Sequence, residues 1–237
     1  MRRAADLFTL ETRASDSRLV AATWWTRSEP EPSFISVAAT QWEMVVTRQR
    51  GAAQVTVRGP ETRATIVPIP QDAEFLGIRF TLGTFMPRLP PGDLVDRAVT
   101  LPPTTGTSFR LHGSTWGVPG RDDVDDFVED LVHAGLLAHD PVAAAAVAGA
   151  GAAEDDVDGL STRSVERRVA RATGLTQGLI RRIRRAERAV ELLAVGVPAP
   201  DAAHRAGYAD QPHLIRSLKR FAGQTPSQVA VAASEHA

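Results

Sequence analysis

Basic side chains are concentrated in the last third of the 237-residue sequence, where they are well placed to contact an anionic partner. Thirteen of them fall within the 58 residues 163–220, among them Arg163, Arg167, Arg168, Arg171, Arg181, Arg182, Arg184, Arg185, Arg216, Lys219 and Arg220. Cationic side chains that neutralise phosphates release condensed counterions, so this density predicts DNA as a partner. A single basic helix is more commonly a solvated surface, and the prediction therefore depends on how these residues are arranged.

The charge of the chain is segregated along the sequence. From Leu160 onward the formal charge is +7, and the residues before it carry -8, which gives the net charge of -1. Such asymmetry suggests two modules with different partners. The alternative is a single domain with one acidic and one basic surface. Hydrophobic residues make up 43% of the chain, which is enough for a buried core in either arrangement.

The basic part contains an internal repeat at an offset of 49 residues, in which the segments 161–176 and 210–225 match in residue type. The first residue of each copy suits a helix N-cap, and the glycine near the end suits the left-handed residue that ends a helix. The matched pairs are Ser161 and Asp210, Val165 and Leu214, Arg167 and Arg216, Val169 and Leu218, Arg171 and Arg220, Gly174 and Gly223, and Thr176 and Thr225. We predict two helices built to one plan, at about 161–173 and 211–222.

Two further helices would position the repeated ones. The stretch PDAAHRAGYADQ predicts a supporting helix near 199–206, and Ala203 and Gly207 would allow a close helix crossing, with Gly207 ending the helix. This arrangement is a helix-turn-helix. Between the copies, TQGLIRRIRRAERAVELLAVG has apolar residues at helical spacing and predicts a helix from about 177 to 195, roughly 28 Å long. Successive turns of B-DNA lie about 34 Å apart, so such a spacer suits two neighbouring major grooves.

The first copy has a less regular supporting segment. In HDPVAAAAVAG, Asp140 suits an N-cap and Pro141 the first helical position. The acidic, small-residue stretch AGAGAAEDDVDG that follows predicts a flexible connection, longer than the usual turn of a helix-turn-helix.

On these residues the sequence resembles the AraC/XylS transcription regulators, whose C-terminal domain holds two helix-turn-helix units on a long connecting helix. The similarity covers about 140–230 and is most specific over GYADQPHLIRSLKRFAGQTP. Residues 20–120 resemble the small β-rich sensor domain of one subgroup of unassigned ligand, on the stretches WEMVVTR, GPETRAT, FLGIRFTLGTFMPRLPPGDLVDR and LHGSTWG.

The resemblance implies which side chains meet DNA. Base-edge contacts fall on Arg163, Glu166, Arg167, Gln211, Pro212, Ile215 and Arg216. Arginine suits guanine, glutamine suits adenine, glutamate accepts from cytosine N4, and the apolar side chains suit a thymine methyl. Phosphate contacts fall on Ser164, Arg171, His213, Lys219 and Arg220. For His213 an equally good interpretation is that it only completes the start of its own helix.

The first copy departs from the family in two respects. Its supporting helix is short and distant in sequence, and Val169 stands where the family usually places an aromatic residue. We expect the first unit to dock on DNA more weakly, so that Arg216→Ala costs more specific affinity than Arg167→Ala.

Residues 18 to about 110 carry strand signals, with short runs rich in Val, Ile, Thr and aromatics such as AAQVTVRG and EFLGIRFTLG. They predict a β-rich barrel or sandwich, so that the whole chain is an α+β protein with an all-α C-terminal domain. The proline-rich stretch FMPRLPPGDLVDRAVTLPP is expected to be a crossover without strands.

An amphipathic helix follows from Asp122, with apolar residues at helical spacing. They are Val124, Phe127, Val128, Leu131 and Val132. This stripe would pack on its own domain or, alternatively, form a dimer contact. The expected domains are a sensor domain at 1–120, a connecting helix at 121–139 and a double helix-turn-helix domain at 140–237.

The composition excludes several kinds of chemistry. The chain has no cysteine, which removes disulfides, thiolate metal sites and a cysteine nucleophile. His112, His133 and His139 do not suggest a clustered metal site, and no glycine stands two positions before Ser114 as in a nucleophile elbow. We expect no cofactor, no metal and no enzymatic activity. A DNA-modifying enzyme that had borrowed this recognition domain would lack an evident reactive group.

The tryptophans of the β-rich region offer weak candidates for a ligand site. Trp24, Trp42, Glu43 and Arg79 could line an apolar pocket with an orienting polar group, and Trp25 and Trp116 complete the tryptophan set. Ordinary core tryptophans are the better interpretation.

Together these features predict a sequence-specific DNA-binding transcription regulator, modulated through its N-terminal domain by a small molecule. The alternative is an effector-independent DNA-binding protein controlled by abundance or a protein partner. RNA polymerase is a further candidate partner. We found no signal-peptide core and no long apolar run, so we expect a cytoplasmic protein without a membrane partner. The sequence leaves open a monomer or a homodimer, and activation or repression.

Overall fold

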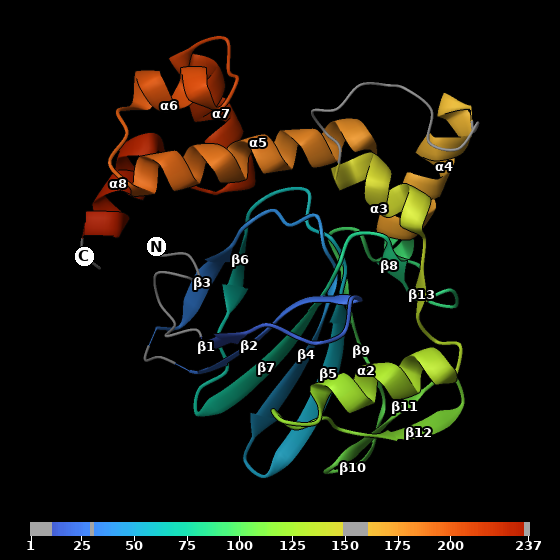
Figure 1. Ribbon diagram of the computed structural model, residues 1–237. Helices are drawn as coiled ribbons and strands as arrows, with labels where there is room; N and C mark the ends of the chain where they lie inside the picture. Colours follow the sequence, from blue (N-terminus) through green and yellow to red (C-terminus); the bar gives the residue numbers. More distant parts are fainter. Residues whose placement is uncertain (1–10, 29–30, 149–160, 235–237) are drawn as a thin grey trace.

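The computed structural model describes residues 11–28, 31–148 and 161–234. A β-rich region at about 11–117 is followed by a helical region, which confirms the predicted fold class (Figure 1). The acidic connection predicted at 148–159 lies, apart from Ala148, outside the described residues.

The β-rich region is built on an antiparallel sheet of six strands in the order β1-β2-β7-β4-β5-β9. These strands are β1 (Glu11–Arg13), β2 (Val20–Arg27), β7 (Ala73–Phe80), β4 (Glu43–Gln49), β5 (Ala52–Arg58) and β9 (Ala98–Thr100). Smaller sheets pair β3 (Ser33–Ser36) with β6 (Thr65–Pro68), β8 (Thr84–Phe85) with β13 (Ala138–His139), and β11 (Ser108–Leu111) with β10 (Pro103–Thr105) and β12 (Ser114–Gly117). Within the described residues the sheet does not close, so the barrel alternative was wrong.

The proline-rich crossover contains more structure than expected. Its first residues include part of β8, its PPGDL stretch forms the 3-10 helix η1 (Pro91–Leu94), and AVT forms β9. The prediction of no strand was therefore wrong. Strand β9 pairs with β5 alone, at the edge of the sheet, where a short strand between prolines needs hydrogen bonds on one side only.

Helix α2 (Val124–His133) covers one face of the large sheet together with β10–β12 (Figure 1). Val124, Phe127, Val128 and Leu131 are buried in the core of the β-rich region, while Val132 is 40% exposed. Phe127 meets the rings of Phe109 and Trp116 edge to face, each with centroids 6.3 Å apart. The apolar stripe of α2 thus packs on its own sheet.

The helical region has its own hydrophobic core, formed around the long helix α5 (Gln177–Ala194). The other helices are α3 (Pro141–Ala148), α4 (Thr162–Thr173), α6 (Ala199–Arg205), α7 (Gln211–Phe221) and α8 (Pro226–Ser234). Helix α5 crosses the top of the β-rich region, with α4 at one end and α7 at the other (Figure 1). Its 18 residues span about 27 Å, close to the length expected from the sequence.

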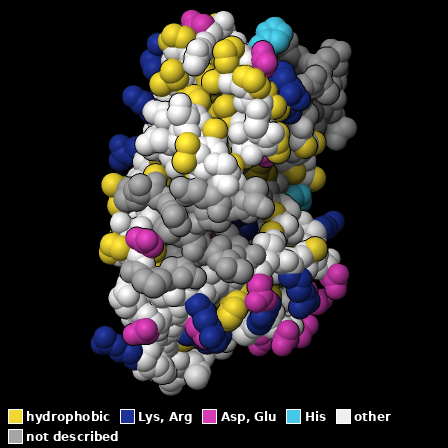
Figure 2. Space-filling view, turned by 90° about the vertical axis from the view of Figure 1, so that its left-hand side faces the viewer, with side chains coloured by type: hydrophobic (Ala, Val, Ile, Leu, Met, Phe, Trp, Pro, Cys, Tyr) yellow, Lys and Arg dark blue, Asp and Glu magenta, His cyan; other side chains and the backbone are white. Residues whose placement is uncertain are grey.

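No helix among the described residues is long and apolar enough to cross a membrane. On the face shown in Figure 2, acidic and basic side chains intermingle over the lower part of the molecule, and hydrophobic side chains gather over the upper part.

Candidate nucleic-acid interface

Helices α6 and α7 form the predicted helix-turn-helix. The Asp210 side chain accepts a hydrogen bond from the His213 backbone N–H at 2.6 Å and so caps α7. Gly207 ends the preceding helix with φ +80°, and a Cβ built on it would find its nearest neighbour only at 4.0 Å. Its role is therefore the left-handed backbone rather than the close helix crossing expected from the sequence.

Tyr208 fixes the turn between these helices. The ring is buried, its hydroxyl lies 2.8 Å from Ser217 Oγ on α7, and the His213 ring meets it edge to face at 5.0 Å. Burial raises the pKa of Tyr208, with smaller opposing contributions from Ser217 and Arg185. His213 thus packs on the turn as well as starting α7.

Helix α4 repeats this plan at the other end of α5. Ser161 Oγ accepts a hydrogen bond from the Ser164 backbone N–H at 3.3 Å, and Gly174 ends the helix with φ +73°. Val169 is fully buried in the helical core, so a valine occupies the inward position where the family usually has an aromatic residue.

Asp140 connects the supporting helix α3 to α4. Its carboxylate accepts a hydrogen bond from the Ala143 N–H at 3.0 Å, as predicted for an N-cap, and pairs with Arg168 Nε at 2.9 Å. Burial alone would raise the pKa of Asp140, but the hydrogen bonds from Arg168 and the backbone, with the charge of Arg168, outweigh it and lower the pKa. The charged carboxylate therefore stabilises this pairing of helices.

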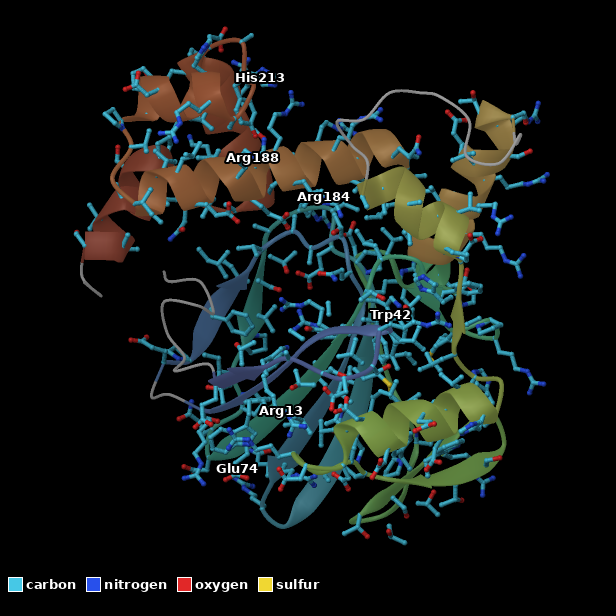
Figure 3. The ribbon with its side chains drawn as sticks, viewed as in Figure 1. Arg13, Trp42, Glu74, Arg184, Arg188 and His213 are labelled. Atoms are coloured by element: carbon cyan, nitrogen blue, oxygen red, sulfur yellow. The ribbon has the colours of Figure 1, made fainter. Side chains whose placement is uncertain are left out.

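Two neighbouring arginines of α5 each hold one supporting helix. Arg185 donates to the carbonyl oxygen of Gly207 at 3.1 Å, and Arg184 donates to the carbonyl oxygen of Val147 at the end of α3. Figure 3 shows Arg184 on α5. Part of the basic cluster seen in the sequence thus stabilises the helical fold.

The side chains predicted to read bases lie along the starts of α4 and α7. Arg163, Glu166, Arg167, Gln211, Pro212 and Arg216 are exposed, and Ile215 is half-buried. Both helix starts are capped and lie at opposite ends of α5, above the β-rich region (Figure 1). The two repeated helices therefore have equivalent, capped starts whose predicted base-reading side chains, Ile215 apart, are exposed.

The side chains predicted to meet phosphates are more spread out. Ser164 Oγ lies 3.0 Å from Ser161 Oγ at the start of α4, and Lys219 is exposed in the last turn of α7. Arg171 lies near the C-terminal end of α4, over the ring of Phe85, and Arg220 lies near the C-terminal end of α7, over the ring of Phe221.

This geometry agrees with the comparison to known families. A family model described as a helix-turn-helix domain matches residues 157–231. The match covers both repeated helices and α5, and it supports a DNA-binding transcription regulator of the AraC type. No curated protein and no solved structure gave a significant match to the chain.

The candidate ligand residues of the β-rich region divide into two groups. Trp24 Nε1 donates to Glu43 Oε2 at 3.2 Å, and Arg79 lies 3.7 Å from the same oxygen. Trp42 instead is buried in the core, stacks on Phe80 at 3.9 Å and donates to the Thr84 carbonyl oxygen at 2.7 Å. Three of the four candidates are thus brought together, and Trp42 is a core residue.

An ion-pair network that sequence reasoning missed extends this group. Arg58 lies opposite Glu43 on the neighbouring strand, 3.4 Å from it, and pairs with Glu61 at 2.8 Å. Ser36 Oγ donates to Glu61 at 2.6 Å. Cross-strand opposite charges favour each other, so the alternation of β4 and β5 could have indicated the first pair.

The side chains of Trp24, Glu43, Arg58 and Arg79 form a polar sheet face, and the charge of Arg79 acts on Glu187 of α5. The carboxyl group of Glu187 is shielded on α5, although the residue retains access to solvent, and this shielding raises its pKa. The positive charges of Arg184 and of Arg79 in β7 lower the pKa of Glu187, and the negative charge of Glu191 raises it further. Arg79 is therefore close enough to influence a charge on the helical region.

A hollow of about 330 Å³ opens beside β1 and β2, lined by Glu11, Thr12, Arg13, Thr23, Trp24, Trp25, Leu76 and Arg121. The Arg121 guanidinium lies 5.0 Å from the Trp25 ring centroid. Among the residues that the structure describes, no three His, Asp or Glu side chains are grouped so that they could hold a metal ion.

Proposed function

We propose that this protein regulates transcription by binding a two-part DNA site, with α4 and α7 entering successive major grooves on one face of the duplex. The observation that carries the proposal is the pair of equivalent capped helices at the two ends of α5. A spacer of about 27 Å is close to the roughly 34 Å repeat of B-DNA. One chain would cover both grooves, so the site need not be palindromic.

The exposed side chains at the helix starts supply base contacts. Arg163, Arg167 and Arg216 would each address guanine through paired hydrogen bonds, and Gln211 would address adenine. Ser164, His213 and Lys219 would contact phosphates and set the register, with Arg171 and Arg220 adding charge at the far helix ends.

Selection of bound duplexes from a random pool tests this proposal. We expect two conserved blocks separated by about one helical turn, and a binding constant that falls steeply with salt, by about 0.9 log units per log unit of salt for each phosphate contacted. A single short block, or binding that does not depend on sequence, would contradict it.

We further propose that the β-rich region adjusts DNA binding in response to a small molecule contacting Trp24. Trp24 is among the residues that line the 330 Å³ hollow, and its indole donates to Glu43, which also lies beside Arg79. The alternative is an effector-independent protein controlled by abundance or a protein partner.

Thermal unfolding in the presence of a metabolite library separates these alternatives, because a ligand of the folded state raises the melting temperature. We expect a compound that stabilises the wild type and not Trp24→Phe or Glu43→Gln, with Trp116→Phe as the control. Tight operator binding without any stabilising compound would favour the effector-free alternative.

A further inference from the structure

The C-terminal end of α7 is completed by the β-rich region. The last carbonyl groups of a helix have no partner within it. Here the Ala38 N–H donates to the Phe221 carbonyl oxygen at 2.7 Å, and the Ala64 N–H donates to that of Arg220 at 2.8 Å. Ala38 is itself buried in the core of the helical region. Two backbone amides of the β-rich region thus take the place of solvent at this helix end.

The equivalent end of α4 packs against a different part of the β-rich region. A Cβ atom built on Gly174 would lie 2.7 Å from the backbone nitrogen of Gly92 in η1. One turn earlier, Arg171 Cζ lies 5.7 Å from the ring centroid of Phe85 in β8. Phe85 is buried with the residues of the helical core, so this contact is part of the packing between the regions.

The two contacts use the same position of the repeat. Gly174 and Gly223 are 49 residues apart, both are left-handed, with φ +73° and +69°, and both touch the β-rich region. A Cβ built on Gly223 would lie 2.9 Å from Ile35 Cγ2 and 3.1 Å from Ala64 Cβ. Each glycine ends its helix and also permits the close approach, because a side chain would enter the partner region.

Two other left-handed glycines of the helical region lack such contacts. Gly196, with φ +84°, has nothing within 4 Å of a built Cβ, and Gly207, with φ +80°, has only Arg185 Cδ at 4.0 Å. At Gly174 and Gly223 a side chain would therefore block the contact with the β-rich region. At Gly196 and Gly207 glycine is needed only for the left-handed backbone conformation.

The amides that hold α7 are themselves fixed in position. Ala39 and Glu61 exchange backbone hydrogen bonds of 3.0 and 2.9 Å, which joins the segments that carry Ala38 and Ala64. The Glu61 carboxylate is held by Ser36 at 2.6 Å and by Arg58 at 2.8 Å. The network on the polar sheet face thus extends to the residues that hold the recognition helix.

We propose that the β-rich region is a brace that holds α4 and α7 by their C-terminal ends and so fixes the spacing between their DNA-reading ends. The contacts leave Arg163 and Gln211, at the starts of these helices, exposed. Fixing the geometry before binding lowers the ordering cost of occupying both halves of a site. This inference rests on the proposed function, because it concerns how the two-part site is read.

Four glycine variants of the full chain test the brace. Gly174→Ala and Gly223→Ala add backbone strain and a clash with the β-rich region, whereas Gly196→Ala and Gly207→Ala add comparable left-handed strain in open space. The probes are the selected two-part duplex, the same duplex with its spacer changed by two base pairs, and a duplex with one block scrambled.

We expect Gly174→Ala and Gly223→Ala to bind the two-part duplex about 5- to 10-fold more weakly than the two control variants, a typical coupling factor between sites. They should also lose most of the wild-type discrimination against the altered spacer, while binding the duplex with one scrambled block as the controls do. Thermal unfolding of all four variants reports whether each one folds.

A second pair of variants, each combined with Ile35→Ala, tests the brace if the clash of the added methyl group unfolds Gly223→Ala. Ile35→Ala removes the atom nearest to the added methyl of Gly223→Ala, so the double variant should recover spacer discrimination. Ile35→Ala should give no such recovery in Gly196→Ala. Equal affinity and spacer discrimination in all four glycine variants would overturn the brace, and so would tighter binding by Gly174→Ala and Gly223→Ala. A wild type that binds no duplex specifically would overturn the proposed function, and the brace with it.

Discussion

Arg185 donates a hydrogen bond to the carbonyl oxygen of Gly207 at 3.1 Å, and its guanidinium lies 5.1 Å from the ring centroid of Tyr208. A single side chain of the long helix thereby holds both the end of α6 and the turn that leads into α7. Arg184, the preceding residue, donates a hydrogen bond to the Val147 carbonyl oxygen at the end of α3. The long helix therefore positions both helix-turn-helix units through adjacent residues, as well as setting their separation.

This relationship predicts that Arg185→Gln destabilises the helical region. We expect a loss of about 1 kcal/mol, because a charge-assisted hydrogen bond at a partly exposed site is removed. Arg188→Gln is the matched control, since Arg188 is exposed on the same helix. Urea unfolding measures both variants. Equal stability of the two would show that the contact with Gly207 contributes nothing.

The helical region was largely predictable because its signals are local. The N-caps Ser161 and Asp210, the left-handed Gly174 and Gly223, and the extent of α5 follow from residue type and spacing, and the structure has them as predicted. Helix α8 was missed, although its sequence carries a readable start signal. Thr225 and Gln228 cap each other reciprocally, with hydrogen bonds of 2.8 and 3.3 Å.

The contacts between the regions were not predictable because they join residues distant in the sequence. Nothing local to Ala38 or Ala64 indicates that their amides complete α7, and nothing near Gly92 indicates the approach of Gly174. The closed barrel was a wrong alternative for a similar reason, since strand order depends on long-range pairing that short strand signals do not specify.

The two recognition helices should contribute unequally to DNA binding. We expect Arg216→Ala to lose more specific affinity than Arg167→Ala, by about 1 kcal/mol within the usual range for one base contact. The α6–α7 unit has a short turn fixed by Tyr208, whereas the α3–α4 unit depends on a longer connection. Titrations at one fixed salt concentration compare the variants, and equal losses would contradict this ordering.

A phosphate contact should behave differently from a base contact. Lys219→Ala should weaken binding to specific and scrambled duplexes alike and reduce the salt slope by about 1. Gln211→Ala should instead relax the preference at one adenine and leave the salt slope unchanged. Both residues are exposed on α7, so each serves as the control for the other. A sequence-dependent loss in Lys219→Ala would exclude the phosphate role.

Removing the Asp140 carboxylate should loosen α3 from α4. We expect Asp140→Ala to cost about 1 to 2 kcal/mol, because the N-cap of α3 and the partner of Arg168 are lost together. Asp201→Ala is a control, since Asp201 is exposed in the first turn of α6 and does not occupy its N-cap. Chemical unfolding gives the free energies, and hydrogen exchange at the α3 amides locates the change.

Acidification should destabilise the junction between β8, β13 and α3. Burial and the charge of Arg18 lower the pKa of His139, and Asp140 opposes this only in part, while the pKa of Asp140 is also lowered. Both groups therefore bind protons more readily in the unfolded chain, so acid favours unfolding. The contribution of His139 to the free energy of unfolding is fully present above its ordinary pKa of about 6.5. It is lost as the pH falls from there toward the lower pKa of the folded state. The contribution of Asp140 to the free energy of unfolding is fully present above its ordinary pKa of about 3.9, and it is lost at more acidic pH.

The histidine variant isolates the first of these windows. His139 Nδ1 lies 3.3 Å from Thr84 Oγ1 in β8. We expect His139→Gln to flatten the fall in unfolding free energy just below pH 6.5 and to leave the change below pH 4 in place. His133→Gln, in which the replaced histidine is exposed at the end of α2, is the control. A wild type whose stability rises on acidification from pH 7 to pH 5.5 would show that the sign assigned to His139 is wrong.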